Sequence, residues 1–246
     1  MNLVQIISDI EKIDADAPER LAYYSRRNWL KMGKRVSAAV AAPAVVAATL
    51  NDAYAQSSGV VAALNFALTL EYLEDEFYRL ALGTSGLIPA ADRATMTQIS
   101  KHEIAHVALL RGALGSAAVA KPAFKFGSVF GNYQTFLSLA QAFEDTGVRA
   151  YKGQAGALLG TDQLTVALQI HSVEARHAAE VRRLRGLRGW ITDADTGPVY
   201  AGEEITSQAG VDLAMLSGKS ATRARESFDE PLTRDQVLAI VAPYLA

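Results

Sequence analysis

Cysteine is missing from this chain of 246 residues, and its absence excludes several kinds of chemistry. Without a thiol there is no disulfide, no thiolate nucleophile, no iron–sulfur cluster and no zinc site built on cysteine. A bound metal ion must therefore be held by oxygen atoms and imidazoles. Charge bias is also small, with a formal net charge of −2, so the composition gives no reason to expect a nucleic-acid partner.

Long apolar runs are scarce. Residues 36–50 form a mild run that contains Pro43, and it falls short of the roughly 20 residues that cross a bilayer comfortably. The run follows Arg26 and Arg27 and precedes the small-x-small sequence of residues 53–55. Together these features resemble a twin-arginine export signal, which implies export of the folded chain to the periplasm or another extracytoplasmic location. Membrane contact is expected only if the segment is retained. The alternative to an export signal is an ordinary amphipathic helix whose two arginines are solvated.

Histidine is rare, and its placement is informative. The four histidines all fall within residues 102–106 and 171–177. Each of these short segments contains a Glu-x-x-His motif, Glu103 with His106 and Glu174 with His177. Residues three apart share one face of a helix, so each motif directs a carboxylate and an imidazole toward one point.

A second motif precedes each Glu-x-x-His, namely a Glu with a Tyr seven residues later. The first copy is Glu71 with Tyr78, and the second is Glu144 with Tyr151. The offsets to the following Glu-x-x-His nearly agree, since 103 − 71 = 32 and 174 − 144 = 30. Four carboxylates and two imidazoles delivered in this way are the ligand set of a two-metal site inside a four-helix bundle.

Apolar residues at helical spacing predict four helices, over about residues 59–82, 89–115, 132–159 and 161–188. Short links join the first two and the last two helices. Residues 116–131 form a longer, irregular link, which at about 3.3 Å per residue can travel the length of a helix. We therefore predict an all-α fold, a four-helix bundle of two antiparallel hairpins joined by a long crossover, with the four glutamates in one layer.

Three parts are expected along the chain. Residues 1–55 form the export-signal-like segment, residues 57–189 the bundle, and residues 190–246 an irregular C-terminal extension. A final helix is predicted from Thr233 to Leu245, since Thr-x-x-Gln at its start fits a capping box. The extension is expected to pack over the bundle or to make contacts in a small homo-oligomer or a partner complex.

These motifs resemble the ferritin-like superfamily of carboxylate-bridged two-metal proteins, and in particular bacterial ferritin-like domain proteins of the desiccation-related type. The resemblance covers about residues 57–190 and implies two iron or manganese ions per chain. It also implies a chemistry, either oxidation of ferrous iron with oxygen or peroxide, or peroxide dismutation. The roles that it implies are single-carboxylate ligands at Glu71 and Glu144, bridging ligands at Glu103 and Glu174, imidazole ligands at His106 and His177, and phenols hydrogen-bonding ligand carboxylates at Tyr78 and Tyr151.

Nearby residues compete for some of these roles. Glu74 and Asp75 lie one turn beyond Glu71, but the matching positions of the second copy are Gly147 and Val148. We therefore expect Glu71 alone to serve as a ligand from this helix.

The remaining histidines leave alternatives open. His171 lies three residues before Glu174, so we expect it to be an extra ligand or a base beside the ligands. His102 lies about one helical turn from His106 and could approach the edge of the site, but we expect it to be a surface histidine. Residues 102–106 also match the H-E-x-x-H motif of zinc peptidases, although that interpretation leaves the second copy unexplained. A further alternative is a structural or interaction protein whose metal site is not catalytic.

Overall fold

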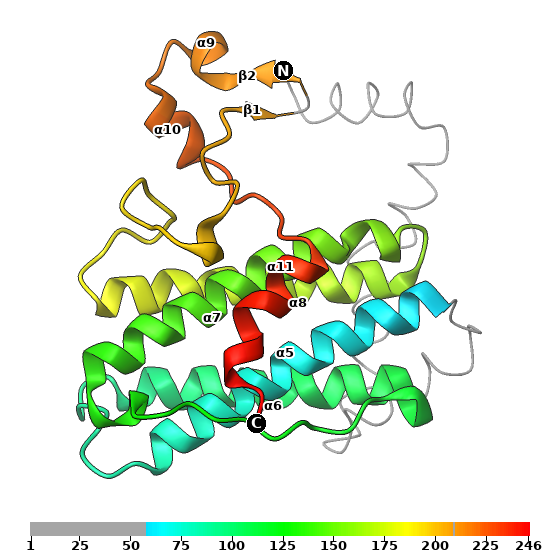
Figure 1. Ribbon diagram of the computed structural model, residues 1–246, viewed down its shortest axis with the longest axis vertical. Coiled ribbons are helices and arrows are strands. Elements are labelled where there is room, and N and C mark those ends of the chain that lie inside the picture. The colour runs from blue at the N-terminus through cyan, green and yellow to red at the C-terminus, as the bar shows by residue number, and fades with distance from the viewer. Residues whose placement is uncertain (1–57, 209) are drawn as a thin grey trace, which may run out of the picture. The chain divides into compact units, whose positions relative to one another are not determined.

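The structure is a computed structural model that describes residues 58–208 and 210–246. The predicted export-signal segment, residues 1–55, lies outside the described residues. Four long helices form a bundle (Figure 1): α5 (Ser58–Gly83), α6 (Arg93–Leu114), α7 (Tyr133–Gln154) and α8 (Asp162–Leu184). Among the described helices, none has both the length and the apolar character needed to cross a membrane.

The bundle has the predicted topology of two hairpins joined by a crossover. Helix α5 packs on α6, and α7 packs on α8. Figure 1 shows α6 and α7 running in the same direction, with the link between them travelling back along the bundle. The link contains two short 3-10 helices, Gly115–Ala117 and Val129–Gly131, and it buries Phe126 and Val129 against the core. The all-α bundle and its crossover are therefore confirmed.

The helix ends differ from the predicted ends for local reasons. Helix α6 begins at Arg93 because the Pro89 carbonyl accepts hydrogen bonds from the backbone of Asp92 and Arg93 in a turn. After α7 the chain tightens into a 3-10 helix, Ala155–Leu158. Helix α8 ends at Leu184 because Gly186 adopts a φ of 74°, a left-handed conformation that commonly terminates helices.

The C-terminal extension contains short elements only. The capping box that begins its last helix is present, since the Thr233 side chain accepts a hydrogen bond from the Gln236 backbone and the Gln236 side chain accepts one from the Thr233 backbone. The α-helix stops at Val241, earlier than predicted, and Pro243 lies in a 3-10 turn. The elements are η4 (Pro198–Tyr200), β1 (Ser207–Gln208), β2 (Val211–Asp212), α9 (Leu213–Ser217), α10 (Ala221–Arg225), α11 (Arg234–Val241) and η5 (Ala242–Tyr244), with β1 and β2 antiparallel.

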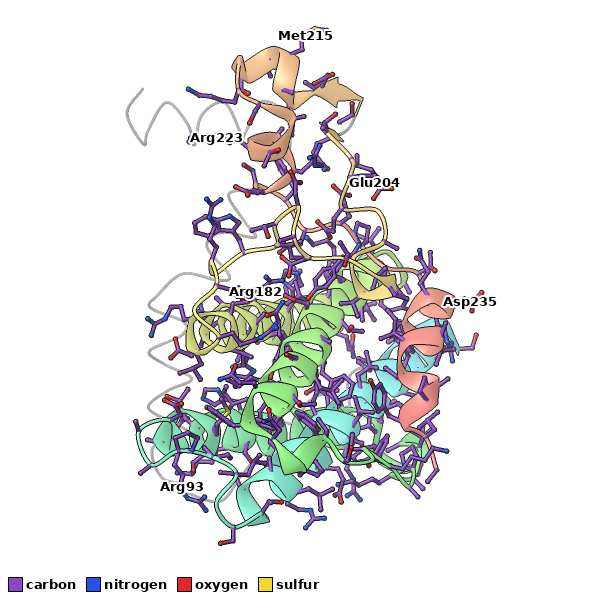
Figure 2. All side chains as sticks on the ribbon, turned by 60° about the vertical axis from the view of Figure 1, so that its left-hand side comes forward. Arg93, Arg182, Glu204, Met215, Arg223 and Asp235 are labelled. Carbon is purple, nitrogen blue, oxygen red and sulfur yellow. The ribbon has the colours of Figure 1, made fainter. Side chains whose placement is uncertain are left out.

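Two buried arginines tie this extension to the bundle. Arg149 of α7 donates to the carbonyls of Val199, Ala201 and Glu230, the last at 2.6 Å. Arg182 of α8 lies where the chain leaves the bundle (Figure 2), and it bridges Asp145 of α7, at 2.6 Å, and Asp195 of the extension, at 3.0 Å. Buried guanidinium groups need such partners, because an unpaired buried charge is costly.

The apolar core consists of two clusters. One contains the stacked or edge-on rings of Phe77, Phe136 and Phe143, and the other contains Leu64, Leu68 and Leu110. Tyr78 belongs to the first cluster and Tyr151 to the second. Polar side chains buried between such clusters are shielded from water, which strengthens the electrostatic interactions among them.

Candidate metal centre

Four glutamates lie at the midpoints of the four bundle helices. Glu71, Glu103, Glu144 and Glu174 are each within about one residue of the middle of α5, α6, α7 and α8, and each is 0% exposed. Equal placement on helices of similar length brings the four carboxylates into one layer across the bundle. His106 and His177, three residues after two of these glutamates, are also buried.

The side chains gather into two overlapping groups. Glu71, Glu103, His106 and Glu174 form one group, and Glu103, Glu144, Glu174 and His177 form the other. Within each group the potential ligand atoms lie within 4.8 Å of one another. Glu103 and Glu174 belong to both groups, so the two groups share their carboxylates from α6 and α8.

The imidazoles face the carboxylates through Nδ1. His106 Nδ1 lies 3.1 Å from oxygens of Glu71 and Glu103 and 3.0 Å from Glu174. On the other side, His177 Nδ1 lies 3.0 Å from Glu103 and 3.2 Å from Glu144. Each imidazole nitrogen is therefore surrounded by carboxylate oxygens from several helices.

Three of the buried carboxylate oxygens have no hydrogen-bond donor among the described residues. They are Oε1 of Glu103 and both oxygens of Glu174, whose close contacts with the imidazoles lack hydrogen-bond geometry. Glu103 and Glu174 are also the two residues common to both groups. Buried oxygens in this state call for a cation, because a buried carboxylate without a partner is unfavourable. The oxygen and imidazole donor set fits bound metal ions.

Residues 59–187 match the family described as Ferritin-like domain. The match covers more than half of the chain and takes in the whole of the bundle from the first turn of α5 to the end of α8. The chain belongs to the ferritin-like family. No curated protein has a matching sequence.

Two tyrosines connect the halves of this ferritin-like bundle. Tyr78 of α5 donates a short hydrogen bond to Glu144 Oε1 of α7. Tyr151 of α7 donates to Glu71 Oε1 of α5, at 2.5 Å. Burial and the adjacent carboxylates raise the pKa of both phenols well above the usual value, so they remain proton donors at neutral pH. Each phenol fixes one oxygen of its glutamate and leaves the other directed at an imidazole.

The carboxylates control the protonation of the imidazoles. Burial alone would lower the pKa of His106, but Glu103, Glu174 and Glu71 outweigh burial and raise this pKa to about 12. Burial likewise opposes protonation of His177, and Glu144 with its neighbours raises the pKa of that group strongly. In the metal-free protein, the protons on Nδ1 of both imidazoles therefore supply positive charge between the carboxylates.

Glu71 and Glu144 are harder to ionise than ordinary glutamates. Burial, followed by the charge of Glu174, raises the pKa of Glu71 to about 8. Burial also raises the pKa of Glu144 to about 7, although the charge of His177 acts in the opposite direction. Divalent cations would favour the ionised forms, because they bring positive charge into the same dry layer.

His102 was expected at the surface, and this expectation is wrong. It is partly buried, its ring stacks on that of His177 with 5.1 Å between centroids, and its Nδ1 lies 2.9 Å from His177 Nε2. Its own Nε2 lies 2.8 Å from Gln98. The outer nitrogen of His177 thus has a partner that holds the ring, an arrangement typical of metal-binding histidines. The sequence signal was the spacing of His102 from His106, one helical turn.

His171 lies outside both groups of potential ligands. Its buried Nε2 has no hydrogen-bond partner among the described residues, and burial and Lys152 lower its pKa. The zinc peptidase interpretation also lacks its geometry, because His102 contacts His177 and does not join His106 in a group.

The two acidic neighbours of Glu71 have different positions. Asp75 faces outward and pairs with Lys121 at 2.9 Å. Glu74 is 2% exposed and lies beside the metal-ligand layer, although it belongs to neither group. Comparison of the two sequence copies set both residues aside, and for Glu74 that comparison missed a buried carboxylate.

Proposed function

We propose that this ferritin-like chain holds two iron or manganese ions and uses them to oxidise ferrous iron or to consume peroxide. The observation that carries the proposal is the pair of buried groups that share Glu103 and Glu174. Two groups with common carboxylates are what a carboxylate-bridged pair of ions requires.

In this proposal each ion has ligands of its own and ligands that it shares. Glu71 and His106 would hold one ion, Glu144 and His177 would hold the other, and Glu103 with Glu174 would bridge them. Two divalent ions carry +4 and the four carboxylates −4, so the buried layer is neutral when both imidazoles have lost their extra protons. Carboxylate and imidazole ligands suit iron and manganese better than copper.

The residues of the chain position and insulate the site. When bound, the metal pair supplies the electron transfer to oxygen or peroxide. Tyr78 and Tyr151 orient the terminal carboxylates, and His102 orients the ring of His177. The two apolar clusters exclude water around this layer, which keeps the charges of the site strongly coupled.

We also propose that the protein acts outside the cytoplasm in protection against stress, like the desiccation-related proteins that its motifs resemble. Support comes from the twin arginines at 26 and 27 and the small-x-small sequence at 53–55. Replacing both arginines by lysine should strand the protein in the cytoplasm. Unchanged cell fractionation of that variant would contradict export by this route.

Four alanine variants test the metal-dependent function. Glu103→Ala and Glu174→Ala should lower metal content and peroxide consumption to a similar degree, because the two residues are related by the pseudo-symmetry of the bundle. Glu71→Ala and Glu144→Ala should form a second matched pair. Metal is measured by elemental analysis after reconstitution with iron or manganese, and activity by consumption of oxygen or peroxide.

Two outcomes would contradict the proposal. Full metal content in Glu174→Ala beside an inactive Glu103→Ala would show that the two glutamates do not bridge a common pair of ions. Equal and negligible activity in the wild type and all four variants, with the metal retained, would instead leave a structural or interaction role for the bundle.

A further inference from the structure

Glu74 is a buried carboxylate that the two groups of potential ligands leave unused. It extends from α5 one turn after Glu71, and it forms no hydrogen bond or ion pair with any other part of the described chain. Burial opposes its ionisation most strongly, followed by the charges of Glu174 and Glu144. A carboxylate buried among other carboxylates is unfavourable unless it is protonated or a cation lies nearby.

A glycine on the facing helix provides the space for this side chain. Gly147 lies on α7 one turn after Glu144, and a Cβ atom at this position would be 3.3 Å from Glu74 Oε1 and 3.5 Å from Glu174 Oε2. Glu74 Oε1 therefore reaches across the bundle to the same small gap that an oxygen of the shared Glu174 borders.

The repeat makes this arrangement one-sided. The residue of the second copy that corresponds to Glu74 is Gly147 itself. One half of the bundle thus supplies a carboxylate, and the other half supplies the gap that receives it. The six potential ligands and the two tyrosines carry the same residue type in both halves, so Glu74 and Gly147 are a place where the pseudo-symmetry of the site is broken.

We propose that Glu74 is a fifth carboxylate of the metal centre and binds the ion held by Glu144, Glu174 and His177, which makes the two ions inequivalent. This inference rests on the proposed two-metal function. Glu74 belongs to neither group of potential ligands, so binding the ion would require its side chain to move toward Glu174 beside Gly147.

A fifth carboxylate changes the preferred charge of the ions. Five carboxylates carry −5, which one divalent and one trivalent ion balance. The site therefore favours a metal that reaches the trivalent state, as iron and manganese do and zinc does not. Glu74 would act as a specificity-determining residue for the ion on the α7 and α8 side.

Metal titrations of conservative variants test this role without any activity assay. Manganese(II) binding is measured by calorimetry, and cobalt(II) binding by visible absorption, for the wild type, Glu74→Gln and Gly147→Ala. Glu74→Gln keeps the size of the side chain, and it should weaken one of the two manganese sites by about 10- to 100-fold while leaving the other nearly unchanged. It should also alter the absorption of only one of the two bound cobalt ions.

Two variants beside Glu74→Gln sharpen the interpretation. Gly147→Ala places a methyl group against Glu74 and should cause a smaller change in the same direction. Glu76→Gln is the matched control, because Glu76 lies on the same helix but pairs with Arg79 and Lys121 away from the cluster, so its metal binding should equal that of the wild type. Circular dichroism verifies that every variant is folded.

The outcomes separate this inference from the proposed function. Wild-type binding of two ions with unchanged affinities and cobalt absorption in Glu74→Gln would overturn the role of Glu74 alone. Equal weakening of both sites would also overturn it, since that result indicates a general charge effect and not a ligand. A wild type that binds fewer than two ions would contradict the two-metal function itself.

Discussion

At the scale of single residues, the phenols of Tyr78 and Tyr151 are the most direct test of pseudo-symmetry. Each donates to the glutamate of the opposite helix, so Tyr78→Phe and Tyr151→Phe should free one oxygen of Glu144 and of Glu71, respectively. Loss of such an orienting hydrogen bond should lower metal affinity by roughly 10-fold or more in both variants. Competition with a chromophoric chelator measures the change.

Tyr133→Phe is the control for this pair. Tyr133 donates to Asp92 at 2.9 Å, outside the metal-ligand layer, so its loss should leave metal affinity unchanged. Strong weakening in only one of the two cluster variants would show that the phenols do not have equivalent roles.

The protonation of the cluster makes the stability of the metal-free protein depend on pH. Glu71 has its folded-state pKa raised to about 8 and Glu144 to about 7, above their value of 4.5 in the unfolded chain. A raised pKa means that the folded state binds more protons, so the stabilisation is present below pH 4.5 and is lost as pH rises through 7 and 8. The raised pKa of His106, about 12, acts in the same direction at higher pH.

Thermal unfolding can follow this effect. In the presence of a chelator, the Tm of the protein should fall as pH rises from about 5.5 to 8.5. The metal-bound protein is the reference, because the groups outside the cluster contribute to both curves. With manganese bound, the carboxylates are ionised and the decline over this range should shrink, while metal affinity rises with pH because binding releases protons. Parallel Tm curves with and without metal would contradict this account.

At the scale of helices and segments, the contact between α7 and the chain before α11 depends on Gly153. A Cβ atom there would lie 2.0 Å from the carbonyl oxygen of Leu232, so Gly153→Ala forces the two backbones apart. Overpacking of this kind typically costs about 1–3 kcal/mol, and the shift should also weaken the hydrogen bond from the Leu232 amide to the Arg149 carbonyl. Denaturant unfolding measures the loss.

Gly156→Ala is the matched substitution. Gly156 has no atom within 4 Å of an added Cβ, so its replacement should leave the unfolding free energy nearly unchanged. Equal effects at Gly153 and Gly156 would mean that the close approach to Leu232 is relieved at little cost.

The helical part of the fold could be predicted because it depends on short-range periodicity. The four helices and the mid-helix positions of the glutamates follow from apolar spacing and from the repeat. Helix ends could not be placed as well, because the turn at Pro89 and the left-handed Gly186 depend on local hydrogen bonds that several sequences satisfy. The hairpin and short helices of the extension have too few residues to show a period.

The candidate site also has a part that the sequence predicts and a part that it does not. The six residues of the two groups of potential ligands could be named because they are three positions that each occur in both copies of the repeat. His102 and Glu74 have no counterpart in the second copy, and it is their neighbours in space, His177 and Gly147, that show how they border the cluster. A comparison of repeats finds the symmetric part of a site and misses the part that breaks the symmetry.

At the scale of the whole described chain, Arg149 connects the extension to the bundle. Its fully buried side chain donates to three carbonyls of the extension and pairs with Glu203 at 2.9 Å. Arg149→Met should leave the carbonyls and Glu203 without their partner, and breaking a buried pair in this way typically costs about 3–5 kcal/mol. Limited proteolysis should then cut within residues 198–230 much sooner than in the wild type.

Arg183→Met provides the comparison for this prediction. Arg183 is exposed and, within residues 58–208 and 210–246, pairs only with Glu180 on its own helix, so its replacement should not change the proteolytic pattern. An unchanged pattern in Arg149→Met would show that other contacts suffice to hold the extension.

The depth of the six clustered residues has a kinetic consequence. Their exposed fractions range from 0% for the glutamates to 8% for His106, so we expect an ion held by them to exchange slowly with the solvent. Release therefore waits for a transient separation of helices, and its rate should not increase with the concentration of an external chelator. The metal content of the purified protein would then depend on which metals were present when the chain folded, as well as on the binding preference of the site.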